Sequence, residues 1–547
     1  MQPDNLLDHF LQWEEQTPDR IFLRQAYAGS WHTWTFAQAG EESRRLAQSM
    51  LEFGLVAGDK VAILAKNCAH WFMSDLAIMM GGFISVPIYP TLSSDHIEEI
   101  LEHSDTKLVI IGKLDDYSTQ RQGIPDHCIK IGVSMYGIEE DHHWESLLEV
   151  YEPLTDVYEW RKDELCTIIY TSGTTGKSKG VMHTMGDFED TLRMIIKEMS
   201  LPMQPNLFSY LPLSHIAERV AVENYGIRVG ATISFAESLE KFNANLVDTQ
   251  PDLFVAVPRI WSKYREGVLT KMSQEKLDRL LKIPIVSSIV KKSIRKKLGL
   301  AKSRIFASGA APISVELQTW FYRLGIDILQ VYGMTEDCVY AHMNRPGKNR
   351  FGTVGTPLPG MEVKFDPQGE IRIKAPGVFK GYYKEPELTS AAFDVEGFLR
   401  TGDIGEYDSD GYLTITGRVK DQFKTDKGKY IAPAPIELKF QSNPIIDLAC
   451  IVGTGIPQPI CLIVLNETID QSQKKSIKEK LVTLLEKINE GLEKHECVEK
   501  VVIMRDSWTV ENELLTPTLK VKRNLIENKY RHRFGEWFVD QNVVVWE

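Results

Sequence analysis

Short, continuously apolar runs recur through the first three-quarters of the chain, with longer helical stretches between them. Such runs predict strands that helices cover on both faces, and their alternation with helices predicts an α/β fold. The predicted strands occupy residues 60–64, 83–86, 108–111, 167–170, 232–234, 253–257, 305–308 and 326–331. Ligands of such sheets gather at the carboxyl ends of strands. The loops after Tyr170, Ser308 and Val331 are therefore the first places to look for a site.

The character of the chain changes after about three-quarters of its length. Residues 418–430 are polar and rich in Lys and Asp, as a linker would be, and residues 448–452 and 460–464 predict two strands. A helix is predicted next, because Ile477, Leu481, Leu484, Leu485, Ile488 and Leu492 share one helical face. We therefore predict a large N-terminal domain of layered, helix-covered β-sheets over residues 1–418 and a small C-terminal α+β domain over residues 419–547.

The charge balance limits the partners of this chain. A formal net charge of −12 over 547 residues argues against broad nucleic-acid binding, which needs a basic surface, although a local cationic site can still hold ATP. Seven cysteines without a CxxC pair indicate reduced thiols and a cytoplasmic setting. No secretory signal is predicted, and the most apolar stretch, residues 76–90, is too short to span a bilayer.

A basic segment, residues 291–304, stands out from this acidic background. It predicts either a solvated helix and loop or peripheral contact with an anionic membrane surface. The solvated helix is the favoured interpretation, because the segment has no strong apolar face of its own. His142 and His143, in a predicted polar loop, are not expected to bind metal, since no other ligand spacing supports it.

The densest cluster of glycines, hydroxyls and lysines follows the predicted strand 167–170. Glycines let the backbone turn its N–H groups toward a polyanion, and hydroxyls and lysines add donors and charge. The candidate phosphate-binding residues are Thr171, Ser172, Gly173, Thr174, Thr175, Gly176, Lys177 and Lys179. A Walker A loop needs four residues between its glycines. Only two separate Gly173 from Gly176, so a P-loop NTPase is not expected.

This segment, YTSGTTGKSKGV over residues 170–181, resembles the phosphate-loop signature of the adenylate-forming enzymes, a family that includes acyl-CoA synthetases, luciferases and peptide-synthetase adenylation domains. The resemblance covers nearly the whole chain, and further motifs follow in the family's order. It implies an ATP-dependent ligase that forms an acyl-adenylate, releases pyrophosphate and passes the acyl group to a thiol. Mg²⁺ is implied as the companion of ATP.

Two segments after predicted strands supply a candidate adenylate pocket. Small residues after the strand 305–308 let a flat base or an acyl chain approach the backbone closely, although they also suit a tight strand-to-helix turn. Residues 332–336 are similar to the family's YGxTE signature. In it, Tyr332 offers a ring to adenine, Thr335 a hydroxyl to the α-phosphate and Glu336 an oxygen ligand to Mg²⁺. The candidates are Ser308, Gly309, Ala310, Ala311, Tyr332, Gly333, Met334, Thr335 and Glu336, with Thr174 as a second candidate for phosphate or metal.

Two further motifs resemble the family's ribose-binding pair and hinge. Asp403 in LRTGD offers two carboxylate oxygens to the ribose hydroxyls, and Arg418 in TGR can donate to the same sugar or to phosphate. Lys420 stands where the family places its hinge residue, which implies that the C-terminal domain is mobile.

Residues 515–523, LTPTLKVKR, look like the family's catalytic-lysine motif. Many members have glycine before that lysine, whereas this chain has Leu519. The resemblance assigns the role to Lys520, with Lys522 as the rival. A carboxylate must attack an anionic phosphate, so a cation near both stabilises charge that develops in the transition state.

The segment 211–219, LPLSHIAER, resembles one that lines the acyl and thiol tunnels of fatty-acid-activating members. His215 is a candidate neighbour of the reacting carboxylate, or else a packed residue at a helix start. No Asp, Glu, Lys or Arg interrupts this segment before Glu218, which favours an apolar tail. We expect a medium- or long-chain fatty acid as substrate and coenzyme A as acceptor.

Two alternatives stay open. One is an acyl-AMP ligase that loads a carrier-protein thiol. The other is an idle nucleotide- or fatty-acid-binding protein, whose signature would be loss of Glu336 or Lys520; both residues are present.

Overall fold

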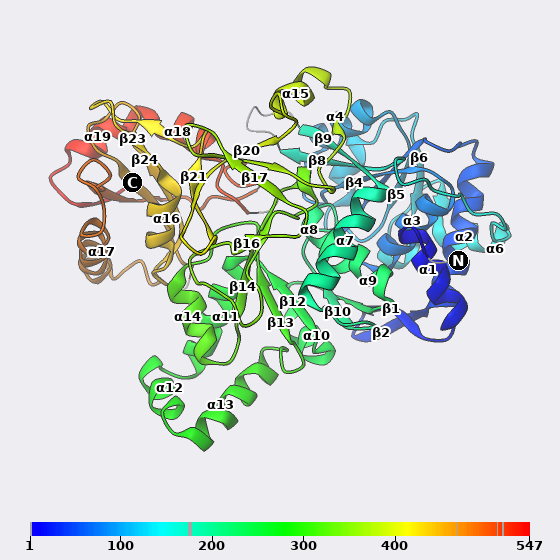
Figure 1. The fold of residues 1–547 in the computed structure, drawn as a ribbon, viewed down its shortest axis with the longest axis horizontal. Helices are drawn as coiled ribbons and strands as arrows, with labels where there is room; N and C mark the ends of the chain where they lie inside the picture. Colours follow the sequence, from blue (N-terminus) through cyan, green and yellow to red (C-terminus); the bar gives the residue numbers. More distant parts are fainter. Residues whose placement is uncertain (1–2, 173–177, 468, 511, 517–518) are drawn as a thin grey trace.

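The apolar runs near the start of the chain pair in the largest sheet of the computed structural model (Figure 1). The structure describes residues 3–172, 178–467, 469–510, 512–516 and 519–547. The sheet has eight strands in the order β19 (Gly381–Tyr382), β9 (Ser178–Thr184), β8 (Leu165–Ser172), β4 (Ile84–Ile88), β3 (Lys60–Leu64), β5 (Thr106–Ile111), β6 (Ile129–Gly132) and β7 (His142–His143). From β8 to β7 the strands are parallel, and β9 turns back against β8.

Strand β3 shows why these runs carry no polar alternation. Val61 and Ile63 enter one buried cluster with helix α3 (Ala69–Met80), while Ala62 and Leu64 enter another with helix α4 (Ser94–Ser104). Because successive side chains point to opposite faces, both sets must be apolar when both faces are covered. The predicted α/β fold class is confirmed.

Three smaller sheets complete the first part of the chain. Their strands are β10 (Asn206–Ser209), β11 (Thr232–Phe235), β1 (Ile21–Tyr27) and β2 (Ser30–Thr35); then β12 (Leu253–Ala256), β13 (Ile305–Ser308), β14 (Ile328–Tyr332), β15 (His342–Met343) and β16 (Thr356–Pro357); then β17 (Glu362–Phe365), β18 (Glu370–Lys374), β20 (Leu399–Tyr407) and β21 (Leu413–Arg418). Besides α3 and α4, the helices are α1 (Leu6–Gln16), α2 (Phe36–Glu52), α5 (Tyr117–Gln120), α6 (Trp144–Val150), α7 (Met185–Met199), α8 (Ile216–Glu218), α9 (Tyr225–Val229), α10 (Phe242–Thr249), α11 (Pro258–Lys271), α12 (Gln274–Leu281), α13 (Pro284–Lys297), α14 (Val315–Arg323) and α15 (Pro386–Ala392).

The residues after 419 form two small sheets and have buried clusters of their own. Their elements are β22 (Phe423–Lys424), β23 (Tyr430–Ile431), α16 (Pro433–Gln441), β24 (Ile446–Val452), β25 (Ile460–Leu465), α17 (Lys474–Asn489), β26 (Lys500–Ile503), α18 (Arg523–Tyr530), α19 (Phe534–Val539) and β27 (Val544–Trp546). Helix α17 buries Ile477, Leu481, Leu485 and Ile488 on the predicted face. The domain boundary between residues 418 and 419 stays a prediction.

One local expectation is wrong. His142 and His143 do not lie in a loop; they form β7, which pairs with β6 through Ile131 and Gly132. Short backbone pairing at the sheet edge outweighs the polar composition that predicted a loop. In the described part of the chain, no helix is long and apolar enough to cross a bilayer.

A buried ion pair ties α3 to the centre of the large sheet. Arg219 donates to the Asp75 carboxylate at 2.7 Å and to the Ser85 hydroxyl of β4 at 3.0 Å, and its guanidinium lies 5.2 Å from the Trp71 ring. The Arg219 and Asp75 side chains are only 4% and 2% exposed. Arg219 opens a π-helical turn over Arg219–Asn224. With water excluded, each charge depends on its partner.

We predict that Asp75→Asn lowers the free energy of unfolding by about 3–5 kcal/mol, because it removes the carboxylate that is hydrogen-bonded to a buried guanidinium. Glu223 remains 3.3 Å from Arg219 Nε, but burial raises the pKa of this carboxyl well above its usual value. The matched control is Asp163→Asn, which removes an exposed pair with Arg161 and should cost less than about 1 kcal/mol. Urea unfolding of both variants checks this; equal midpoint shifts would contradict it.

Candidate functional site

The carboxyl ends of three parallel strands lie side by side. Ala256 at the end of β12 pairs with Ser308 of β13, which in turn pairs with Gln330 of β14. The loops that follow these strands therefore leave the sheet at one edge, where α/β proteins bind ligands. The predicted site loops after Ser308 and Tyr332 both begin here.

The loop after β13 is buried at its start and open at its end. Ser308 is fully buried, and its Oγ has no hydrogen-bond partner among the described residues. Gly309 and Ala310 are half-buried, and Ala311 is exposed. Ala310 has φ +65°, a left-handed conformation that costs about 1–2 kcal/mol for an alanine. Such strain is common at ligand sites, where the surrounding structure fixes the backbone.

A buried carboxylate shapes the loop after β14. Asp337 accepts hydrogen bonds from the Met334 and Tyr340 amides at 2.8 and 3.2 Å. Burial is the main reason why its pKa rises to about 7. Gly333 is required, because a Cβ there would lie 2.5 Å from the backbone of Val339. These contacts fix the backbone of residues 333–336.

A histidine that the sequence analysis did not identify holds the backbone of Thr335 by a hydrogen bond. His183 of β9 is fully buried, and its Nε2 donates to the Thr335 carbonyl at 2.7 Å. Its Nδ1 lies 3.7 Å from Asp187 and 3.4 Å from the Cys338 sulfur. His183 therefore links the large sheet to the loop after β14. Its position on a strand outside every motif gave no sequence signal.

Glu336 is held beside the end of β9. Its Oε1 accepts a hydrogen bond from the Tyr382 hydroxyl at 2.8 Å, and Tyr382 of β19 pairs with Val181 of β9. Lys179 places its ammonium 5.2 Å from the Tyr382 ring. Tyr382 is a second residue that the sequence analysis missed, since nothing local marks its function.

The core of the predicted phosphate loop, Gly173, Thr174, Thr175, Gly176 and Lys177, lies outside the described residues. The backbone of Ser172 and that of Ser178, which lie on its two sides, pair across β8 and β9, as do Thr171 and Lys179. Within the described ranges there is no group of three or more metal-binding His, Cys, Asp or Glu side chains. A single carboxylate such as Glu336 still fits Mg²⁺ that is held largely by nucleotide phosphates, because Mg²⁺ usually takes one or two protein carboxylates with the rest from phosphate and water.

Asp403 is the residue on which the site converges. Its Oδ2 accepts a hydrogen bond from the Tyr332 hydroxyl at 2.8 Å, and its Oδ1 accepts one from Arg418 Nε at 2.7 Å. Asp403 and Arg418 face each other across β20 and β21. Each carboxylate oxygen has a second lone pair, so a vicinal diol can still bind both. The bond to Asp403 also fixes the plane of the Tyr332 ring.

Lys520 reaches this cluster from the C-terminal part of the chain. The residue is exposed as a whole, but protein surrounds its amine. This burial is the largest cause of a pKa lowered to about 8; repulsion from Arg418 adds to it, and attraction to Asp403 opposes it. The Lys520 N–H donates to Thr516 Oγ1 at 3.0 Å, and Leu519 has φ +61°. Leu519 thus adopts the conformation that a glycine would take without strain.

Two contacts hold the C-terminal part against helix α11. Arg259 pairs with Asp447 at 2.8 Å, and Arg265 donates to the Ser442 carbonyl at 3.4 Å. Arg523, three residues after Lys520, donates to Glu437 at 2.6 Å. The loop that carries Lys520 is therefore fixed at its C-terminal end.

His215 lies within reach of the Lys520 charge. Its Nδ1 accepts a hydrogen bond from the Ala217 amide at 3.1 Å, as an N-cap. Burial and, to a smaller extent, the charge of Lys520 lower the pKa of His215 to about 3. The ring is therefore neutral near pH 7 and carries its proton on Nε2, where it can donate to an anion. Both expectations for His215 are compatible with this geometry.

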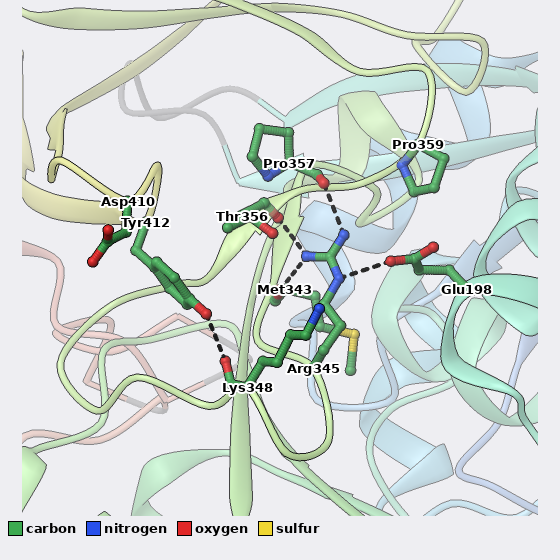
Figure 2. A pocket seen from close by; sticks show the side chains of 9 residues that line it. All are labelled: Glu198, Met343, Arg345, Lys348, Thr356, Pro357, Pro359, Asp410 and Tyr412. Carbon is green, nitrogen blue, oxygen red and sulfur yellow. Dashed lines mark hydrogen bonds and ion pairs between the residues drawn. The ribbon is translucent and has the colours of Figure 1, made fainter.

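A separate surface recess does not share residues with this cluster (Figure 2). At its centre, Arg345 donates to Glu198 at 3.1 Å and to the carbonyls of Thr356 and Pro357 at 2.6 and 2.8 Å. Tyr412 donates to the Lys348 carbonyl at 3.0 Å. These polar groups satisfy one another, so we assign the recess a structural role.

Two family models match the chain. The model described as AMP-binding enzyme matches residues 10–383, and the model described as AMP-binding enzyme C-terminal domain matches residues 420–541. The chain is 25% identical to the long-chain-fatty-acid–CoA ligase FadD15 of Mycobacterium bovis, over 96% of each chain. It is 26% identical to long chain acyl-CoA synthetase 3 of Arabidopsis thaliana, over 98% of this chain and 92% of that one.

Solved structures share the fold. The o-succinylbenzoate CoA synthetase of Bacillus subtilis, in complex with its acyl-adenylate intermediate, has a TM-score of 0.75 and 22% identity over 95% of this chain and 97% of that one. The A-PCP didomain of a carboxylic acid reductase from Segniliparus rugosus, in complex with AMP, has a TM-score of 0.81 and 21% identity over 98% of this chain and 82% of that one.

The environment of Lys520 predicts an unusual titration. Acetic anhydride reacts with neutral amines, so the labelling of Lys520 should rise with a midpoint near pH 8, whereas ordinary lysines rise near about 10.4. Peptide mass spectrometry across pH measures this. Arg418→Gln should move the midpoint upward by removing a repelling cation, and Asp403→Asn should move it downward. A midpoint for Lys520 no different from those of ordinary lysines would contradict the placement of its amine.

Proposed function

We propose, because this chain belongs to the AMP-binding enzyme family of adenylate-forming ligases, that it activates a medium- or long-chain fatty acid with ATP to acyl-AMP and then transfers the acyl group to coenzyme A. The observation that carries the proposal is the cluster of Tyr332, Asp403, Arg418 and Lys520. It combines residues from two sheets and from the C-terminal part of the chain around one carboxylate.

In this proposal the large domain binds the adenosine part of ATP. Asp403 accepts the ribose hydroxyls through its remaining lone pairs, and the fixed ring of Tyr332 offers a face to adenine. Glu336 and Lys179 both lie beside Tyr382, and they would offer the phosphates of ATP an oxygen ligand for Mg²⁺ and a positive charge. Mg²⁺ bound with ATP would neutralise phosphate charge while the acid attacks.

Lys520 would bring together the two anions of the first step. The fatty-acid carboxylate attacks the α-phosphate, and the pyrophosphate leaves. A cation beside both anions lowers their repulsion and stabilises the transition state. The neutral His215 can hold the carboxylate by a hydrogen bond from Nε2, and the ring stays unprotonated on Nδ1 because its pKa is far below neutrality.

An aromatic cluster packs against the chain just before the segment that contains His215, and it supports an apolar acid. Tyr210 stacks on Phe254 with ring centroids 5.8 Å apart, and Phe254 meets Trp261 edge-on at 5.4 Å. Tyr210 directly precedes the segment 211–219, which contains His215. The relatives named as long-chain acyl-CoA ligases support the same class of substrate.

The decisive experiment is ATP–pyrophosphate exchange with acids of two to eighteen carbons, followed by a thioester assay with free coenzyme A. We expect exchange that depends on an acid of medium or long chain, and acyl-CoA as product. Exchange without acyl-CoA would favour transfer to a carrier protein. The absence of exchange with every acid would favour an idle binding protein.

We predict that Lys520→Ala slows acid-dependent exchange by roughly 10²–10³-fold, corresponding to about 3–4 kcal/mol of lost transition-state stabilisation. Thioester formation from supplied acyl-AMP should be largely retained, because that step does not need the cation at the α-phosphate. The matched control is Lys522→Ala, two residues away on the same segment. Equal losses in both half-reactions, or a larger loss for Lys522→Ala, would contradict the role of Lys520.

We also predict that Asp403→Asn raises the KM for ATP by at least about tenfold, because a charged hydrogen-bond acceptor is worth about 1.5–3 kcal/mol. Tyr332→Phe should raise it less, since Arg418 still orients the carboxylate. Asp410→Asn, in the turn between β20 and β21, is the control for the same charge change. Exchange measured against ATP concentration would refute the prediction if Asp403→Asn and Asp410→Asn had similar KM values.

A further inference from the structure

Helices α12 and α13 project from the body of the molecule, at the bottom of the view in Figure 1. They follow α11 and return the chain to β13. The inner face of α13 is packed: Ser287 and Ile294 are buried, and near the end of the helix Arg295 donates to the Ser303 carbonyl at 2.8 Å and lies 5.4 Å from the Phe306 ring. Because this face of α13 packs on the protein, the opposite face points to solvent.

This projection has a charge opposite to that of the whole protein. Residues 282–304 contain eight Lys and Arg and no Asp or Glu, in a chain with a net charge of −12. The neighbouring ion pairs along the chain are those of Arg265 and Arg323, and none that the described residues form involves this segment. Its positive charge is therefore available to an external anion.

The outward face also has apolar residues at its tip. Ile283, Ile285 and Ile289 are 51%, 78% and 64% exposed. Ile285, Ile289, Lys292 and Lys296 follow one another at intervals of three or four residues and therefore share one face of the helix. Lys292 and Lys296 are exposed too. One stripe of α13 is thus apolar in its first half and basic in its second.

This arrangement changes the interpretation of the basic segment. The solvated-helix interpretation depended on the lack of an apolar face within residues 291–304. The structure begins α13 at Pro284, so the isoleucines before the basic run join its outer face. Exposed isoleucines next to unpaired lysines are typical of helices that lie in the interface of anionic membranes.

We propose that the projecting end of α12 and α13 docks on an anionic lipid bilayer. The isoleucines at the tip would enter the boundary between headgroups and acyl chains, and Lys292, Lys296 and Lys297 would contact lipid phosphates. A bilayer fits better than a nucleic acid, because a nucleic-acid backbone offers no apolar layer to receive Ile285 and Ile289. The proposal needs no catalytic activity and can fail or hold independently of the proposed function.

The test is co-sedimentation of the full chain with large unilamellar vesicles. Vesicles of 30% phosphatidylglycerol in phosphatidylcholine should bind the protein at least about tenfold more tightly than pure phosphatidylcholine, and binding should weaken as salt rises. Lys292→Gln/Lys296→Gln should reduce binding roughly 30-fold, because each lysine near an anionic surface contributes about 1 kcal/mol of binding free energy. Ile285→Ser/Ile289→Ser should reduce it by at least about tenfold through lost apolar burial.

Matched controls change the same chemistry elsewhere. Lys475→Gln/Lys480→Gln removes two exposed lysines from α17, and Leu239→Ser/Val395→Ser removes two apolar side chains that are 87% and 103% exposed. Both controls should bind vesicles within about twofold of the parent chain. Thermal melting of every variant verifies its fold.

Three outcomes would overturn the proposal. One is equal binding to neutral and anionic vesicles. Another is loss of binding by the controls to the same extent as by the α13 variants. The third is binding to polyuridylate that matches binding to vesicles and is insensitive to Ile285→Ser/Ile289→Ser, which would assign the surface to nucleic acid.

Discussion

The hydrogen-bonded carboxylate of Asp403 is the constraint on which the rest of the site depends. Tyr332 and Arg418 each donate to one of its oxygens, so two strands of one sheet and the end of β14 in another are fixed relative to each other. The same charge attracts Lys520, while Arg418 repels it. One carboxylate thus shapes the proposed ribose site and partly offsets the lowering of the Lys520 pKa, of which burial is the main cause.

Buried polar groups below this point hold the loops that reach it. Asp337 caps the loop after β14, and His183 supports Thr335 from the large sheet. Arg219 and Asp75 lock the helix-covered centre of that sheet. Each of these groups would be costly to leave unpaired. The contacts that they make therefore favour one arrangement of the loops, and Ala310 and Leu519 adopt left-handed conformations within it.

The projecting α12–α13 unit suggests how an acidic protein could approach an anionic surface. Its basic and apolar residues are concentrated on the outer face of a helix whose inner face buries Ser287 and Ile294. Leu277 and Ile294, on the inner side of this unit, belong to the same buried cluster as Trp261 and Phe254. The helices of the proposed membrane contact and the aromatic residues near the proposed acyl-binding region therefore pack into one hydrophobic cluster. A protein that docks on a bilayer through these helices would be close to a substrate that partitions into membranes.

The sequence by itself determined the elements that local pattern controls. The strands 60–64 and 305–308 were predicted to the residue, because continuously apolar runs have few alternatives in an α/β fold. The motifs also named Tyr332, Asp403 and Arg418, since their chemistry is local. Only the tertiary structure decided what these residues touch. It recruited His183 and Tyr382, which lie outside every motif, brought Lys520 within the electrostatic influence of Asp403 across more than a hundred residues, and joined Ile285 to the basic run on one face of α13. Long-range contacts depend on how whole sheets pack, and a pattern with a period of two or 3.6 residues does not carry that information.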